Sequence, residues 1–237
     1  MTQSELTQLV QVEAMKLATS LGFGAAAQAT KDANVTNSRQ ALLDAYVAKK
    51  IDGNVAAAIG GELGIADYTG YSVISLTSAS STNLIRLTDP SFQRKRGVTN
   101  INQGQLEKSE AAAIVGIRLV GAVVTYASGA TQDTINAAVK KAKFAPIASL
   151  SAFDALSNGE AQFKLNTRVV LEKMQVSNFT HVGEKKQINA AFFLDSPKII
   201  NPKEDIDFSI ETDGGFVIAA DTTLLLKVEF LGSKTTL

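Results

Sequence analysis

The sequence contains no cysteine and no tryptophan, and its 237 residues include a single histidine, His181. Without a thiol, a cysteine nucleophile, a disulfide framework and a thiolate zinc site are all excluded. One imidazole cannot provide the histidine pair of a transition-metal site, and a catalytic Ser-His arrangement would have to use His181. Residues 177–182 around it supply no orienting carboxylate, and no GxSxG motif occurs. We therefore expect no cofactor, no metal and no catalysis, with His181 in a loop or at a strand end.

Excess charge of one sign and long apolar runs are also missing. The 23 basic side chains equal the 23 acidic ones, so no global attraction to nucleic acid or anionic membrane is expected. The longest apolar stretch, residues 111–127, is broken by Gly116, Arg118 and Gly121, and it falls short of the roughly 18 residues of a membrane span. Acidic residues near the N-terminus do not fit a secretory signal. Near-neutral charge removes repulsion between copies of the chain.

The front of the chain has the pattern of amphipathic helices. Residues 4–21 are predicted to form the clearest one, with Ser4 as N-cap and Gly22 at its end. A second helix is expected from 38 to about 50, and a weaker third from 54 to 63, interrupted by Gly60-Gly61. In the second helix the residues expected to face inward are Ala41, Leu42, Ala45, Tyr46 and Val47.

After residue 64 the pattern changes to short strands separated by turns. We predict strands at 71–77, 83–88, 111–119, 120–127, 161–165, 168–173, 187–194, 198–200, 205–211, 216–218 and 223–231, with a short helix at 134–143. Residues 111–127 could also be one strand bent at Gly121, and 147–156 stays ambiguous. In 205–211, Ile206, Phe208 and Ile210 alternate with polar residues, which predicts one dry face. Asp213-Gly214-Gly215 predicts a hairpin.

This order of elements predicts a mainly β protein with a helical N-terminal region. Strands at intervals of about 8 to 12 residues, without βαβ alternation, indicate an antiparallel β-sandwich or jelly roll. We expect a helical arm over residues 1–65 and a β body over 66–237. A division of that body into two small units, 66–145 and 146–237, stays open.

Two charged clusters are candidate sites. Glu204, Asp205, Asp207, Glu211 and Asp213 could share a Ca²⁺ ion, or Asp205 and Asp207 could act as an acid/base pair. The alternative is a solvated edge strand, which charges protect from aggregation.

The second cluster is the basic run 93–97, which contains Arg94, Lys95 and Arg96. These side chains could bind the phosphates of a packaged genome or an acidic surface of a neighbouring subunit. The run lacks the interleaved aromatic residues of a single-strand binder, and a solvated loop is the alternative.

The predicted helix 4–21 offers an apolar stripe with Leu6, Leu9, Val10 and Leu17. The stripe could dock on the chain's own core, pack between subunits or lie on a membrane. Lys16 is the only basic residue in the stretch, which disfavours an anionic-lipid anchor.

The pattern of the second half resembles the jelly-roll coat proteins of tailless bacteriophages. The resemblance rests on the short strands between residues 160 and 231, the breaks at Ser196-Pro197 and Asn201-Pro202, and the Asp-Gly-Gly turn before a last apolar strand. It covers about 70% of the chain. It implies self-assembly, usually as trimers or pentamers around a genome or an inner membrane, and no catalysis. The length suits a single roll better than two in tandem.

We therefore expect a virion structural protein, a phage coat or vertex subunit assembled in the host cytoplasm. Its expected partners are copies of itself, other virion proteins, and a packaged nucleic acid or an underlying membrane. One alternative is a carbohydrate-binding or adhesive β-sandwich, although exposed aromatics for stacking on sugars are scarce. The other is a hydrolase that uses Asp205 and Asp207.

Overall fold

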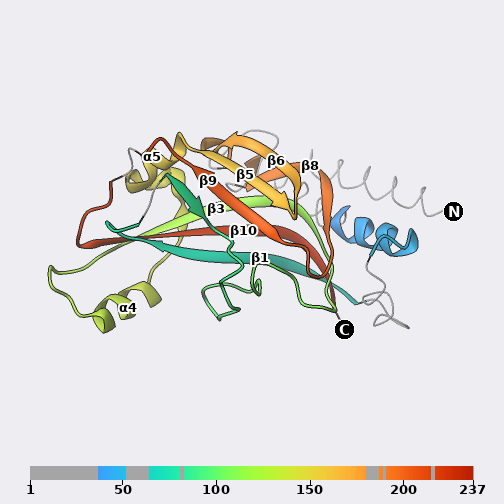
Figure 1. The fold of residues 1–237 in the computed structure, drawn as a ribbon, viewed down its shortest axis with the longest axis horizontal. Helices are drawn as coiled ribbons and strands as arrows, with labels where there is room; N and C mark the ends of the chain where they lie inside the picture. The colour runs from blue at the N-terminus through green and yellow to red at the C-terminus, as the bar shows by residue number, and fades with distance from the viewer. Residues whose placement is uncertain are drawn as a thin grey trace, which may run out of the picture.

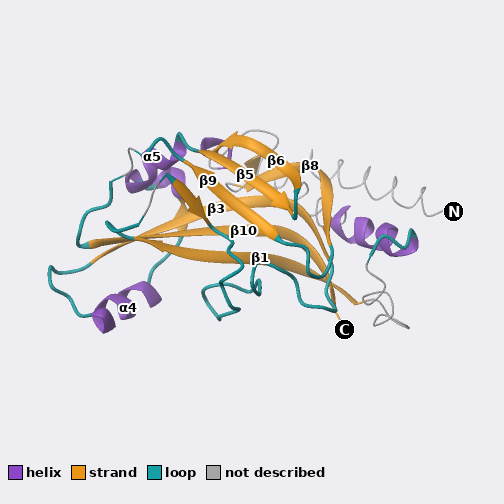
Figure 2. Cartoon of the chain, viewed as in Figure 1, coloured by secondary structure: helices purple, strands orange, loops and turns teal. Residues whose placement is uncertain are grey.

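The computed structural model describes residues 37–51, 64–80, 83–179, 187–188, 191–214 and 217–236. The helices predicted at 4–21 and 54–63, and His181, lie outside these residues. The described chain is mainly β, with two antiparallel sheets (Figures 1 and 2). The fold class predicted from the sequence is confirmed to that extent.

The first sheet has six strands and the second has four. The first contains, in spatial order, β1 (Gly64–Leu76), β10 (Thr222–Thr236), β3 (Ala112–Thr125), β8 (Ala191–Ile200) and β7 (Gln187–Ile188), with β4 (Ala145–Pro146) on β3. The second contains β2 (Leu84–Arg86), β9 (Ile206–Glu211), β5 (Glu160–Leu165) and β6 (Arg168–Gln175). Each sheet thus combines strands from both sides of residue 146.

The strand pairs are nested along the chain. β1 pairs with β10, β2 with β9, β3 with β8, and β5 with β6, all antiparallel. β9 and β10 therefore lie in different sheets, and the hairpin predicted at residues 213–215 is wrong. Of the strand predicted at 216–218, residues 217 and 218 are described and form no strand. A turn signal reports only that the chain can reverse locally, and it does not say which strands pair.

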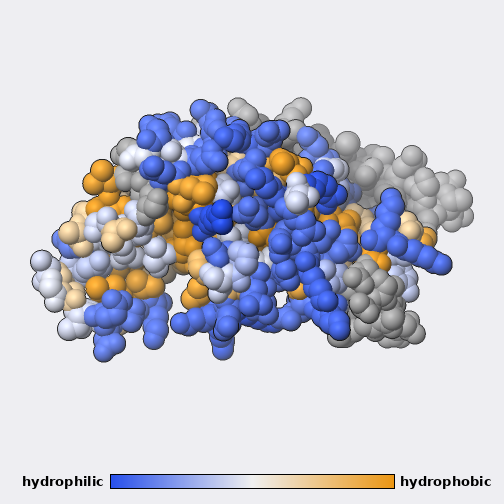
Figure 3. Space-filling view, viewed as in Figure 1, coloured by the Kyte–Doolittle hydropathy of each residue, from blue (hydrophilic) through white to orange (hydrophobic). Residues whose placement is uncertain are grey.

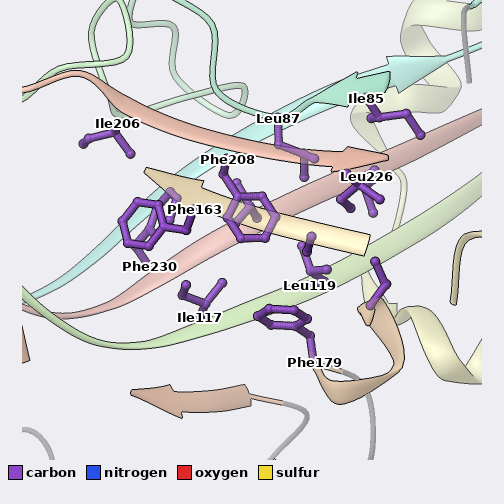
Figure 4. Packing of buried hydrophobic residues seen from close by; sticks show 14 of the residues in the cluster. Ile85, Leu87, Ile117, Leu119, Phe163, Phe179, Ile206, Phe208, Leu226 and Phe230 are labelled. Carbon is purple, nitrogen blue, oxygen red and sulfur yellow. The ribbon is translucent and has the colours of Figure 1, made fainter. Parts of the chain in front are cut away.

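The hydrophobic core lies between the two sheets. Ile206, Phe208 and Ile210 of β9 are buried, which confirms the dry face predicted for this strand. Leu224, Leu226, Val228 and Phe230 of β10 also join the core, as the alternation predicts. At its centre the ring of Phe230 lies 5.3 Å from that of Phe163 and 6.1 Å from that of Phe208, centroid to centroid (Figure 4).

The stretch 111–127 forms one strand, β3, and its irregularity is not at Gly121. Against β10, the consecutive residues Leu231 and Gly232 pair with Gly116 and Ile114, so Val115 is an extra residue in a bulge of β3. The register with β8 also shifts there, from Ile114 opposite Lys198 to Gly116 opposite Phe193. Gly121 continues the strand, and a Cβ there would lie 2.7 Å from the Phe153 ring. β8 differs too, because it runs through the Ser196-Pro197 break that was expected to end it.

Two helices cover the outer face of the first sheet, at its opposite ends (Figure 1). Helix 37–47 buries Leu42 and Ala45 against β3, whereas α4 (Gln132–Lys140) packs beside β3 and β10. Val47, expected to face inward, is 79% exposed, so that prediction is wrong. Five residues beyond Leu42 at 3.6 residues per turn, it lies off the buried stripe.

Short helical segments cover the end of the core that lies away from helix 37–47. They are η1 (Ile147–Ser149), η2 (Ser151–Phe153), α5 (Asp154–Ser157) and η3 (Val176–Phe179). Each of the first three contributes one fully buried side chain to the core: Ile147, Phe153 and Leu156. The stretch 147–156, which the sequence left ambiguous, therefore forms short helical turns rather than a strand.

Candidate functional site

The basic run 93–97, with the turn that follows it, forms a loop along the free edge of β1, and we call residues 93–100 the basic loop. The Val73 N–H donates to the Val98 oxygen at 2.8 Å, and the Asn100 N–H donates to the Tyr71 oxygen at 3.2 Å. The Tyr71 N–H donates to the Asn100 Oδ1 at 2.7 Å. These bonds occupy backbone groups of an edge strand that would otherwise be open to pairing with another chain.

A tight turn orients the basic side chains. Lys95 forms a β-bridge with Thr99, and Gly97 takes a left-handed conformation with φ +82° between them. The Gly97 N–H donates to the Tyr71 hydroxyl at 3.2 Å. The sequence thus builds a small hydrogen-bonded platform on β1 rather than an unsupported loop.

All three basic side chains of this loop reach solvent. Arg94 is 57% exposed, and its one ion pair, with Glu107 at 3.8 Å, is a surface contact. Lys95 and Arg96 are exposed and form no ion pair with the described residues. Figure 3 shows hydrophilic side chains over the part of the surface where this loop lies, below β1 in Figure 1. The loop therefore presents cations that suit carboxylate or phosphate groups.

The acidic cluster is spread along β9 and its flanking loops. Asp205 Oδ1 accepts from Gln105 Nε2 at 2.5 Å, and Glu211 pairs with Lys173 at 2.8 Å. Asp207 lies in register with Lys164 of β5. Within the described ranges no group of three His, Asp or Glu side chains is placed to hold a metal ion. The geometry thus matches the charged outer face of a sheet.

The structure also contains an ionic cluster that the sequence analysis missed, on the outer face of the first sheet. Glu229 of β10 is 5% exposed and lies directly opposite Arg118 of β3. Arg118 Nε donates to Glu229 Oε2 at 2.6 Å, and Lys227 Nζ lies 2.5 Å from Oε1. The Lys227 ammonium also lies 4.8 Å from the centre of the Tyr71 ring and 5.5 Å from that of Phe144.

Opposing influences act on the Glu229 carboxyl. Burial alone would raise its pKa, but the hydrogen bond from Lys227 and the positive charge of Arg118 outweigh burial, and the pKa is lowered. The Glu229 carboxyl therefore stays ionised, and its ion pair with Arg118 links β10 to β3. Its sequence signal was charged residues within apolar strand patterns: Arg118 in 111–127, and Lys227 and Glu229 among the leucines of β10.

The subunit-contact residues predicted on the N-terminal helix, Leu6, Leu9, Val10 and Leu17, lie outside the described residues. In the part of the chain that is described, no helix is long and apolar enough to cross a membrane. No protein-family model matches the sequence, and no curated protein matches it.

Proposed function

We propose that the chain is a virion structural protein: a phage coat or vertex subunit, folded as a single jelly roll, that assembles with copies of itself. The nested strand pairing carries the proposal. A jelly roll is an eight-strand antiparallel ribbon wrapped across itself, in which the first strand pairs with the last and the middle two pair with each other. β1, β2, β3, β5, β6, β8, β9 and β10 have this order.

The jelly roll supports this function because viral capsid domains commonly use it. In such a shell the subunits pack side by side. An open strand edge is a hazard there, because it can pair with a strand of a neighbouring subunit and join two sheets that should remain separate. The basic loop covers one edge, that of β1, with hydrogen-bonded backbone. It also places Arg94, Lys95 and Arg96 where a neighbouring subunit or a packaged nucleic acid can meet them.

Lectins share the jelly roll, so a carbohydrate-binding module is the second candidate. Sugar sites usually present a flat aromatic ring to solvent. All four tyrosines of this chain are at least half covered, and Phe144 is the aromatic side chain among the exposed large hydrophobics of the described residues. Phe144 itself lies against the Lys227 ammonium. This arrangement favours the structural function.

A hydrolase that uses Asp205 and Asp207 is the third candidate. Asp205 is exposed just before β9, Asp207 is partly buried on β9, and Gln105 Nε2 donates to Asp205 Oδ1. Acid/base pairs usually lie in an enclosed cleft, and the outer face of this sheet does not enclose the two carboxyl groups. In our proposal the protein acts mechanically, and its location is the virion.

Mass measurement by light scattering, followed by electron microscopy of the purified chain, tests the proposal. We expect a closed homo-oligomer or shell at micromolar concentration, because shell subunits present self-complementary surfaces. A species that stays monomeric across the micromolar range, with no assembly on concentration or in the presence of nucleic acid, would contradict the proposal. Binding to a glycan array by such a monomer would favour the second candidate.

A further inference from the structure

An open pocket lies where three segments meet beside the C-terminal end of helix 37–47. The helix end contributes Lys49 and Lys50, the turn between β5 and β6 contributes Asn166, and the loop between β8 and β9 contributes Lys203 and Glu204. Its volume is about 500 Å³. That volume is within the range of small-molecule sites and far exceeds what a bare ion needs.

The backbone around this pocket is unusual. Four non-glycine residues in the described ranges have positive φ, and three of them line the pocket: Lys49 at 53°, Asn166 at 53° and Lys203 at 62°. Asparagine tolerates this conformation, but lysine has no such preference and glycine is the usual residue. Unfavourable backbone conformations of this kind concentrate at functional sites.

Lys49 occupies the position where glycine normally ends a helix. The Lys50 N–H donates to the Ala45 oxygen at 2.8 Å and the Lys49 N–H to the Tyr46 oxygen at 3.0 Å, which is the bonding of a Schellman motif. A glycine there would relax the backbone but would remove an ammonium group from the pocket.

The charges of the pocket are unbalanced. Three lysines face one carboxylate, Glu204, and its Oε2 already accepts the Asn201 N–H at 2.8 Å. Among the described residues none of the three lysines forms an ion pair. Asn166 bonds the Asp205 backbone through both its N–H and its Oδ1, at 2.8 Å each, which fixes the two loops to each other.

We propose that this pocket binds a small phosphorylated molecule, with its phosphate held by Lys49, Lys50 and Lys203. A phosphate carries up to two negative charges and several acceptor oxygens, for which the three lysines that line this pocket are suitable partners. The pocket has room for a polar body beyond the phosphate. The lining residues come from three short segments around one pocket rather than from a continuous groove, which suits a small ligand better than a long nucleic-acid backbone.

Calorimetric titration of the full chain with pyrophosphate and with ATP tests this inference, and citrate serves as the carboxylate probe. We expect saturable binding of the phosphorylated probes and weaker binding of citrate. The double variant K49G/K203G should weaken phosphate binding by about tenfold or more, since it removes two of three cations from the pocket. Its thermal unfolding midpoint should not fall, because glycine suits both backbone positions.

The matched control is K140A/K141A, which removes two lysines from the end of α4, far from the pocket. It should bind the probes like the unmodified chain. Equal weakening in both double variants would mean non-specific charge attraction and would overturn the inference. Absence of binding at millimolar probe, or tighter binding of citrate or of a single-stranded oligonucleotide than of ATP, would also overturn it. None of these outcomes depends on the oligomeric state, which tests the virion proposal separately.

Discussion

Arg118 and Glu229 lie directly opposite each other on β3 and β10, with Arg118 Nε 2.6 Å from Glu229 Oε2. The glutamate side chain is 7% exposed and the arginine side chain 35%. Lys227 approaches the other carboxylate oxygen at 2.5 Å, so two cations share one buried anion. The Glu229 carboxylate therefore neutralises the charges of both Arg118 and Lys227.

Replacing Glu229 by glutamine should therefore destabilise the fold. The amide keeps the shape of the side chain but leaves Arg118 and Lys227 without a counter-charge in a mostly buried place. We predict that E229Q lowers the free energy of unfolding by about 2–4 kcal/mol, somewhat below the usual loss for a fully buried pair because Arg118 reaches water. Urea denaturation at neutral pH measures the change.

The matched control is E211Q on β9. Glu211 pairs with Lys173 at 2.8 Å, but both side chains are 50% exposed. We expect E211Q to change the free energy of unfolding by less than about 1 kcal/mol. If the two variants lost equal stability, burial of the Arg118–Glu229–Lys227 cluster would not be the cause.

The same cluster predicts that the stability of the fold depends on pH. The Glu229 pKa is lowered in the folded protein relative to its ordinary value of 4.5. Such a carboxyl contributes stability above its unfolded-state pKa and loses that contribution as the pH falls through the folded-state pKa. The stability difference between the unmodified chain and E229Q should thus be constant near neutral pH and shrink below 4.5. A difference that persists or grows in acid would contradict this prediction.

The sequence predicted the faces of single strands well and their partners poorly. Ile206, Phe208 and Ile210 were placed correctly because side chains alternate on any strand, whatever its neighbours are. The β1–β10 pair could not be found in this way, because it joins Leu76 to Leu224 and no local signal links them. β1 also begins at Gly64, seven residues before the predicted start, because pairing with β10 extends it through Gly64, Ala66, Asp67 and Gly70, which have weak strand propensity.

The candidate sites show the same difference between local and long-range information. Arg94, Lys95 and Arg96 adjoin in sequence, so the basic loop was visible as a local run. The ionic cluster and the lysine pocket each depend on residues from distant segments, which only the sheet register or the loop packing brings together. No local pattern in the sequence links Arg118 to Lys227 and Glu229, or Lys49 and Lys50 to Lys203.

Gly121 gives a test of the core. A Cβ at this position would lie 2.7 Å from two atoms of the Phe153 ring, and Phe153 is fully buried. We predict that G121A lowers the free energy of unfolding by about 1–3 kcal/mol, as overpacking in a core does. Thermal and urea unfolding both report the change.

A second substitution separates this clash from the general effect of losing a glycine. In the double variant G121A/F153L the smaller side chain leaves room for the new methyl group. The two substitutions should then cost less together than the sum of their separate effects, because residues in contact couple. Strict additivity would mean that Gly121 is needed for a reason other than the approach of Phe153.

The basic loop gives the test of assembly at residue level. Arg94, Lys95 and Arg96 are exposed, and the loop is held to β1 by backbone and Asn100 hydrogen bonds, so R94Q/K95Q/R96Q should leave the unfolding midpoint unchanged. If the loop contacts a neighbouring subunit or nucleic acid, the same variant should shift the mass distribution toward smaller species. That shift should be mimicked in the unmodified chain by added salt, which screens exposed charges beyond about 10 Å at 0.1 M.

The triple variant K140Q/K141Q/K143Q removes the same charge from α4 and its C-terminal end, at the opposite end of the first sheet from helix 37–47. Any effect of net charge alone must appear in both triple variants, because each leaves the chain with an excess of three acidic groups. Contact through the basic loop predicts a loss of assembly in the first variant and none in the second. Sedimentation velocity at matched concentrations distinguishes the two, and equal behaviour would remove the basic loop from the assembly interface.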